Sequence, residues 1–227
     1  MSEPGFRHVL AFDCSGAACS AAVRVDGGLV AERFAAMARG QAEALLPQIR
    51  SVMADAGMDF ADLDAIATTI GPGSFTGLRL GLAAARGLVL AAGLPLVAVT
   101  GFEALLAGLS DDRREGRPVA VFIDSRRGPV FAQLFDAGLL PSGPPATVES
   151  AAVDRWLPPG PVAILADSGA QLPQPAPDRA LWRAAIRAGD IARLAAGPGS
   201  AERVRRDPVP LYLRAPDATL PRQRTAP

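Results

Sequence analysis

The sequence predicts an α/β protein built from two duplicated lobes, of which the second is reduced. Short apolar runs typical of buried strands alternate with two long amphipathic helical patterns. An apolar strand that ends in aspartate, a polar turn and a returning strand occur twice, as VLAFDCSGAACSAAV and as VAVFIDSRRGPVFAQLF. Apolar residues make up 49% of a 227-residue chain, so we expect a globular protein with a substantial core.

The first lobe is expected to cover residues 1–110. Tight turns separate apolar runs at 8–12, 19–25 and 29–34, which predicts three antiparallel strands. Later elements in this lobe are a helix over 41–56 stopped by Gly57, a strand over 65–70, a helix over 75–92, a strand over 96–100 and a short helix over 102–109. No hairpin turn joins the last two strands, so their connection is expected to be a right-handed parallel crossover.

The second lobe is expected to cover residues 111–227 and to end in a proline-rich surface tail that begins at Arg203. A charged connector over 110–118 marks the boundary. Its predicted elements are strands over 119–124, 130–135 and 162–166, a loop over 138–146, and helices over 149–157 and 186–196.

The stretch GPGSFTGLRLGLAAARGLVLAAG, residues 71–93, joins a strand to the second long helix. Pro72 presets the first turn position and Gly73 is expected to take a positive φ at the next. Ser74 or Thr76 can cap the helix, which Gly93 ends. Gly77, Gly81 and Ala85 recur every four residues, and this stripe with almost no side chain predicts close packing. An anion site at the helix N-terminus is the alternative, but no P-loop Lys-Ser/Thr follows.

Asp13 and Asp124 each end a buried strand in matching halves. Such carboxylates could hold hydrated Mg²⁺ between two lobes, or each could cap its own turn. We favour capping for Asp124 and leave both interpretations open for Asp13. His8 is the single histidine, so metal pairs and Ser-His-Asp triads lack partners. Cys14 and Cys19 are too few for a disulfide framework or a zinc set.

Charge excludes some classes of function. The 23 cationic residues are all arginine and equal the 23 anionic residues, so no global field attracts nucleic acid. The most apolar region is interrupted by Arg79 and Arg86, and neither a transmembrane span nor a signal peptide is expected. We therefore expect a cytoplasmic protein with no membrane partner.

Several segments together resemble the TsaB (YeaZ) family, which is needed to make N6-threonylcarbamoyladenosine (t6A) in tRNA. They are LAFDCSGAACSAAV, ALLPQI, GPGSFTGLRLGLAAARGL, IDSRRGPVFAQLF and PVPLYLRAPDA. The resemblance covers nearly the whole chain in order. It implies an actin-like (ASKHA, ribonuclease H-like) fold of two lobes.

The resemblance also implies a non-catalytic assembly partner of a TsaD-like enzyme that transfers threonylcarbamoyl to adenosine 37 of tRNAs reading ANN codons. A TsaE-like ATPase joins the pair in that family, and tRNA is expected to be met only through the complex. Because an apolar helix pair without its paralogue tends to self-associate, we expect the free chain to form a homodimer. The related enzymes bind a metal through histidines on the first long helix. Here that helix begins Gly40-Gln41-Ala42-Glu43-Ala44, so no metal site is expected, and a peptidase activity is unsupported. No cofactor of its own is expected, while ATP and Mg²⁺ could bind at complex interfaces.

The two long helices are the partner surface that the resemblance implies. The predicted interface residues are Leu45, Leu46, Ile49, Met53, Gly77, Leu78, Gly81, Leu82 and Ala85, although half of them could instead fill the chain's own core. A second hypothesis is a small ATP-dependent enzyme of the actin-like kinase class. Its nucleotide contacts would be Asp13, Ser15, Gly71, Gly73 and Ser74, but the second half offers no matching phosphate loop.

Overall fold

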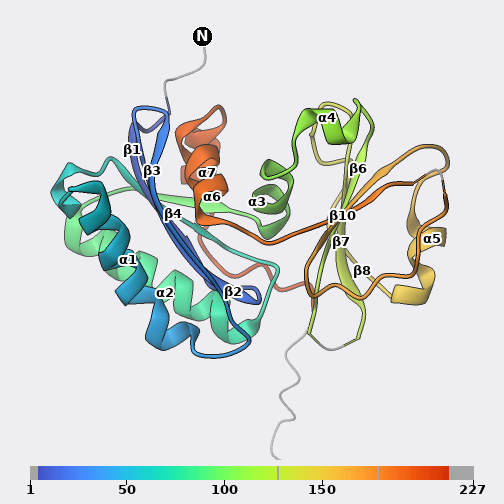
Figure 1. Ribbon diagram of the computed structural model, residues 1–227, viewed down its shortest axis with the longest axis horizontal. Helices are drawn as coiled ribbons and strands as arrows, with labels where there is room; N and C mark the ends of the chain where they lie inside the picture. Colours follow the sequence, from blue (N-terminus) through green and yellow to red (C-terminus); the bar gives the residue numbers. More distant parts are fainter. Residues whose placement is uncertain (1–4, 127, 178, 215–227) are drawn as a thin grey trace, which may run out of the picture.

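The computed structural model describes residues 5–126, 128–177 and 179–214, and it contains two five-stranded sheets that lie side by side (Figure 1). In the first sheet the strand order is β3-β2-β1-β4-β5. Its strands are β1 (His8–Asp13), β2 (Ala18–Val25), β3 (Gly28–Ala36), β4 (Ala65–Thr69) and β5 (Leu96–Val99). β1, β2 and β3 pair antiparallel, whereas β1, β4 and β5 pair parallel. The predicted meander and parallel crossover are confirmed.

The second sheet repeats this topology with the order β10-β9-β6-β7-β8. Its strands are β6 (Val119–Ile123), β7 (Val130–Phe135), β8 (Ala146–Val148), β9 (Ala163–Asp167) and β10 (Leu181–Ala184). β6, β7 and β8 pair antiparallel, and β6, β9 and β10 pair parallel, as their counterparts do in the first sheet. This correspondence confirms the actin-like fold with an internal duplication.

The second sheet is covered more sparsely than the first. Between β8 and β9 the chain forms only a 3₁₀ turn, η2 (Ser150–Ala152), and the four-residue helix α5 (Val153–Trp156), where a longer helix was expected. The sequence interpretation missed the two edge strands, β8 and β10. Edge strands of three and four residues are too short to show an apolar alternation in the sequence. They form because they pair with a neighbouring strand.

Two long helices, α1 (Gln41–Ala56) and α2 (Phe75–Ala92), cover the outer face of the first sheet (Figure 1). Both match their predicted bounds. Gly57 and Gly93 end them in the left-handed conformation that glycine adopts readily. The apolar side of α1 is buried against the sheet through Leu45, Ile49 and Val52.

Three shorter helices lie between the sheets: α3 (Gly101–Ala107), α6 (Ala188–Ala196) and α7 (Ser200–Arg205). α6 belongs to the end of the chain, yet it packs on β1 and β2 of the first sheet. The Ala188 backbone N–H donates to Ser20 Oγ at 3.1 Å, and that of Gly189 donates to Glu32 Oε1 at 3.0 Å. The helices over residues 188–205 therefore pack on the first sheet, although the sequence interpretation assigned these residues to the second lobe.

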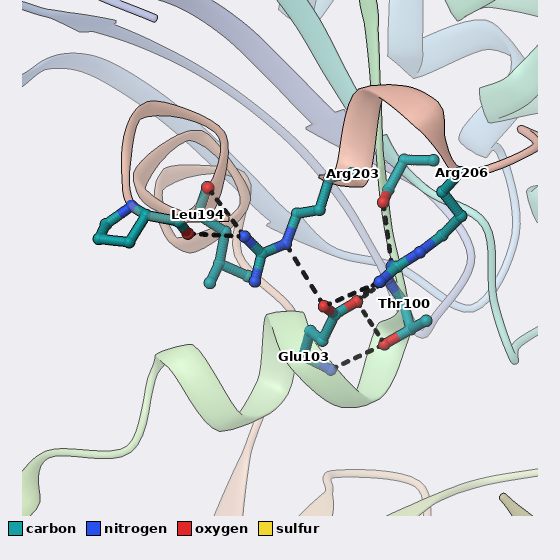
Figure 2. A network of polar contacts seen from close by, with 7 residues as sticks. Thr100, Glu103, Leu194, Arg203 and Arg206 are labelled. Atoms are coloured by element: carbon teal, nitrogen blue, oxygen red, sulfur yellow. Dashed lines mark hydrogen bonds and ion pairs between the residues drawn. The ribbon is translucent and has the colours of Figure 1, made fainter. Parts of the chain in front are cut away.

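Arg203, where the tail was predicted to begin, lies inside the helix α7. A further short helix, α4 (Asp111–Arg114), lies in the predicted connector. Arg203 and Arg206 converge on Glu103 of α3 (Figure 2). Arg206 Nη1 lies 2.6 Å from Glu103 Oε2, and Arg203 Nε lies 3.3 Å from Glu103 Oε1. Burial alone would raise the pKa of Glu103, but hydrogen bonds from Arg206 and Thr100, and the charges of both arginines, hold that pKa below its ordinary value.

Residues 207–213, which we call the strap, cross α2 and reach the second sheet. The Pro208 carbonyl accepts from Arg86 Nη2 at 2.8 Å, and the Leu211 N–H donates to the Ile70 carbonyl at 2.7 Å. The Leu213 carbonyl accepts from Thr147 Oγ1 of β8 at 3.2 Å. The predicted surface position of the tail holds for these residues, and residues 215–227 lie outside the described part.

Candidate functional site

The loop before α2 docks directly on the turn between β1 and β2. The Ser74 N–H donates to the Ser15 carbonyl at 2.8 Å, and Ser74 Oγ caps the helix by accepting from the Gly77 N–H at 3.0 Å. A Cβ on Gly73 would lie only 2.8 Å from the Ser15 carbonyl oxygen. Gly71, not Gly73, takes the positive φ, at 104°, so that part of the turn prediction was wrong. Gly73 is required for close approach, which a local turn rule does not reveal.

Asp13 lies under this loop, 2% exposed, with its carboxylate engaged inside the chain. Oδ1 accepts from Ser15 Oγ at 2.7 Å and from Thr69 Oγ1, while Oδ2 accepts from the Ser15 N–H at 3.2 Å. Burial raises the pKa of Asp13, against the lowering effect of these hydrogen bonds. The sequence interpretation missed Thr69, which ends the strand next to β1. The geometry is that of a buried turn cap.

The second half contains a matching arrangement at the ends of β6 and β9. Asp124 Oδ1 accepts from the Arg126 N–H at 2.7 Å, so Asp124 caps its own turn as predicted. Asp167 Oδ2 accepts from the Asp124 N–H at 3.1 Å, and its Oδ1 accepts from the Ala170 N–H at 2.7 Å. Burial raises the pKa of Asp167. Among the described residues, no group of three or more His, Cys, Asp or Glu side chains could hold a metal ion.

The two cysteines are free and buried beside these turns. Burial, followed by the charge of Asp13, raises the pKa of the Cys14 thiol and raises that of Cys19 to about 11. Cys14 Sγ donates to the Gly77 carbonyl at 3.3 Å. Both thiols are therefore protonated packing groups at neutral pH, because the thiolate is the nucleophilic form.

A groove of about 480 Å³ lies between the N-termini of α1 and α2. Its lining consists of Gly16, residues 38–43, Ser74, Thr76, Gly77, Leu80 and Arg126. Of the five predicted nucleotide contacts, only Ser74 lines it. Asp13, Ser15, Gly71 and Gly73 pack against their own chain instead.

The structure also corrects the choice of predicted interface residues. Leu46 is 50% exposed, whereas the other eight are buried in the chain's own core: Leu45, Ile49, Met53, Gly77, Leu78, Gly81, Leu82 and Ala85. The Gly77 position explains the glycine stripe, because a Cβ there would lie 2.1 Å from the Cys14 carbonyl oxygen. The predicted packing role of the stripe is confirmed. Helical spacing cannot tell which apolar side faces inward when both sides are apolar.

The outward side of α2 is unusually apolar. By length and composition α2 is the one helix among the described residues that could cross a membrane, yet only 28% of it is buried. Its exposed positions include Ala83, Gly87, Leu90 and Ala91. Leu46 and Pro47 are exposed on the neighbouring α1. These exposed apolar positions, together with the exposed Arg79 and Arg86 on the same helix, make α2 the candidate interaction surface of the chain.

Replacing Asp13 with asparagine is expected to lower the free energy of unfolding by about 2 kcal/mol. With the NH₂ group on the Oδ2 side, it faces the Ser15 N–H donor. With it on the Oδ1 side, the Ser15 and Thr69 hydroxyls must accept instead of donate, so the hydrogen bonds to the carboxylate charge are lost in either orientation. Urea unfolding of the isolated chain measures the change. Asp154→Asn is the control, because Asp154 is exposed and pairs with Arg179 only at a long distance of 3.9 Å; its effect should stay below about 0.5 kcal/mol. If the isolated chain binds Mg-ATP and Asp13→Asn weakens that binding, the interpretation of Asp13 as a buried turn cap is contradicted.

Comparisons with known proteins show which proteins this chain resembles. Residues 24–139 match the family model described as TsaD, tRNA N6-adenosine threonylcarbamoyltransferase. The chain is 47% identical over 91 residues to that enzyme of Erythrobacter litoralis, and 35% identical over 123 residues to the tRNA threonylcarbamoyladenosine biosynthesis protein TsaB of Escherichia coli. These alignments cover 39% and 54% of this chain, and they span only 26% and 52% of the two relatives. The solved structure of YeaZ from Pseudomonas aeruginosa is 27% identical, has a TM-score of 0.75, and is matched over 91% of this chain and 100% of that one.

Proposed function

Because the chain belongs to the family of TsaD and its TsaB (YeaZ) paralogues, we propose that it is the non-catalytic partner of a TsaD-like enzyme in t6A biosynthesis. The observation that carries the proposal is the match to YeaZ over the whole of that structure, with an exposed apolar helix pair on one face. The Asp13 carboxylate, the best candidate for phosphate chemistry, is engaged by its own turn, which supports a role without catalysis.

The outward face of α1 and α2 is the proposed surface for the TsaD-like paralogue. Leu46, Ala83, Gly87 and Leu90 are exposed there. Small side chains allow two helix pairs to approach closely, because interaxial distance depends on the residues at the contact. In the absence of the paralogue, the same face would pair with a second copy of this chain.

The rest of the assembly follows the resemblance. A TsaE-like ATPase would join the pair, tRNA would be bound through the complex, and ATP with Mg²⁺ would bind at interfaces between subunits. Because t6A is made on tRNA, the proposed location is the cytoplasm. The chain would act through residues 1–110 as the partner lobe, with residues 111–227 as the degenerate lobe.

Ala83→Arg is expected to abolish association with the cognate TsaD-like enzyme and to reduce t6A in tRNA to the level of a deletion strain. A long charged side chain at the centre of a close helix contact leaves no room for the partner and buries a charge. Mass spectrometry of tRNA nucleosides and light scattering of the mixed proteins measure the two effects. Ala151→Arg is the matched control, since Ala151 is exposed in the second lobe. Normal t6A in a deletion strain would overturn the proposed function.

A further inference from the structure

One side of α2 carries two arginines that have no acidic partner. Arg79 and Arg86 are exposed, and within the described residues neither forms an ion pair. The α2 sequence, FTGLRLGLAAARGLVLAA, contains no carboxylate. By helical spacing, Phe75, Arg79, Arg86 and Leu90 share one side of the helix. Water solvates both exposed guanidinium groups, and each can also bind an anionic group on another molecule.

The strap holds both arginines in place. Arg79 Nε donates to Tyr212 Oη at 3.0 Å, and its guanidinium carbon lies 3.7 Å from the centre of the Phe75 ring. The Phe75 and Tyr212 rings stack with centroids 5.6 Å apart. Arg86 is held by the Pro208 carbonyl. Ordering an arginine before binding removes part of the entropy that its immobilisation would otherwise cost.

The donors that remain free define what could bind. Among the described residues, Arg79 donates a side-chain hydrogen bond only from Nε and Arg86 only from Nη2, so the other terminal nitrogens have no partner in that part of the chain. A guanidinium with free terminal nitrogens binds a carboxylate or a phosphate in a bidentate manner. The surroundings favour a protein carboxylate, because Phe75 (47% exposed), Leu90 (86%), Val209 and Tyr212 (43%) present apolar surface to the same side. Aromatic and arginine side chains together are typical of protein binding hot spots.

We propose that this flank, formed by Phe75, Arg79, Arg86 and Leu90 of α2 with Val209 and Tyr212 of the strap, binds an acidic, apolar segment of the TsaD-like enzyme. The inference rests on the proposed function and extends its interface along the side of α2. It also assigns a role to the strap, which orders the two arginines. The flank favours the enzyme over a second copy of this chain, because its six residues include two cations and no carboxylate, and the strap adds only Asp207 beside them.

Calorimetric titration of the full chain with its cognate TsaD-like enzyme, at low and moderate salt, tests the proposal. The double variant Arg79→Glu/Arg86→Glu is expected to weaken association about 30-fold or more at low salt and to invert its salt dependence, because added salt then screens a repulsion. Arg79→Lys keeps the charge but loses the planar donor pair and should weaken association several-fold. Arg155→Glu, at an exposed position on α5, is the matched control and should bind like the wild type. Thermal unfolding of each variant verifies that it is folded.

The outcomes separate this inference from the proposed function. If Ala83→Arg abolishes association while the double variant binds with unchanged affinity and salt dependence, the flank proposal is overturned and the proposed function stands. If both variants associate normally, the helix face is not the interface, and both the flank proposal and the proposed binding surface are overturned. The proposed function itself is tested by t6A in the deletion strain. If the double variant assembles normally but the complex binds tRNA more weakly, the flank contacts nucleic acid and the protein-segment proposal is overturned.

Discussion

Gly77→Ala is expected to lower the free energy of unfolding by about 3 kcal/mol or more, a large effect for a single methyl group. The added Cβ would lie 2.1 Å from the Cys14 carbonyl oxygen and 3.0 Å from its carbonyl carbon, and backbone atoms cannot rotate away. Either α2 or the β1–β2 turn must shift, which is the cost of overpacking a dense interior. Urea unfolding followed by circular dichroism measures the loss.

Two glycines of the same helix provide matched controls. Gly87 is exposed with nothing within 4 Å of the added Cβ, so Gly87→Ala should stabilise the isolated chain by about 1 kcal/mol. At Gly81 the nearest atoms, Cys14 Sγ and Thr68 Oγ1, are both at 3.5 Å, which is ordinary contact. Gly81→Ala should therefore be tolerated. If Gly77→Ala unfolds at the same urea concentration as Gly87→Ala, the stripe does not pack as the structure indicates.

Glu103→Gln is expected to lower the free energy of unfolding at neutral pH by about 3 kcal/mol. Glu103 has a side chain that is 18% exposed, and it is the shared counterion of Arg203 and Arg206 (Figure 2). Without its charge, two largely buried guanidinium groups lose their ion pairs. Leaving a buried charge unpaired typically destabilises a protein by more than the intact ion pair stabilises it. The exposed Glu202 on α7 is the control position, and Glu202→Gln should change stability by less than about 0.5 kcal/mol.

The same carboxylate predicts a pH dependence. The pKa of Glu103 is lower in the folded chain than its ordinary value of 4.5, so the folded state releases this proton more readily than the unfolded state. The stabilisation is therefore complete above about pH 4.5 and is lost as the pH falls through the folded pKa. Urea unfolding between pH 3 and pH 7 should show the wild type and Glu103→Gln converging at low pH. Parallel curves throughout this range would contradict the assignment.

The elements that local signals specify were predicted well. α1 and α2 match residue for residue, because apolar spacing defines their length and glycine caps define their ends. The three-strand meander and the repeated aspartate at a strand end depend on contacts that are near in sequence. The duplicated fold could therefore be predicted from sequence, and so could Ser74 as a cap and Asp124 as a turn residue.

Only the tertiary structure decided which residues meet across long separations. Arg206 and Glu103 are 103 positions apart, and Tyr212 and Arg79 are 133 apart, so no local pattern links them. The placement of α6 on the first sheet likewise depends on the assembled core. The sequence by itself determined the duplicated strand pattern and the two long helices. The fold alone decided that the glycine stripe faces inward and that the opposite apolar face stays exposed, because burial depends on what packs against a helix and not on its period.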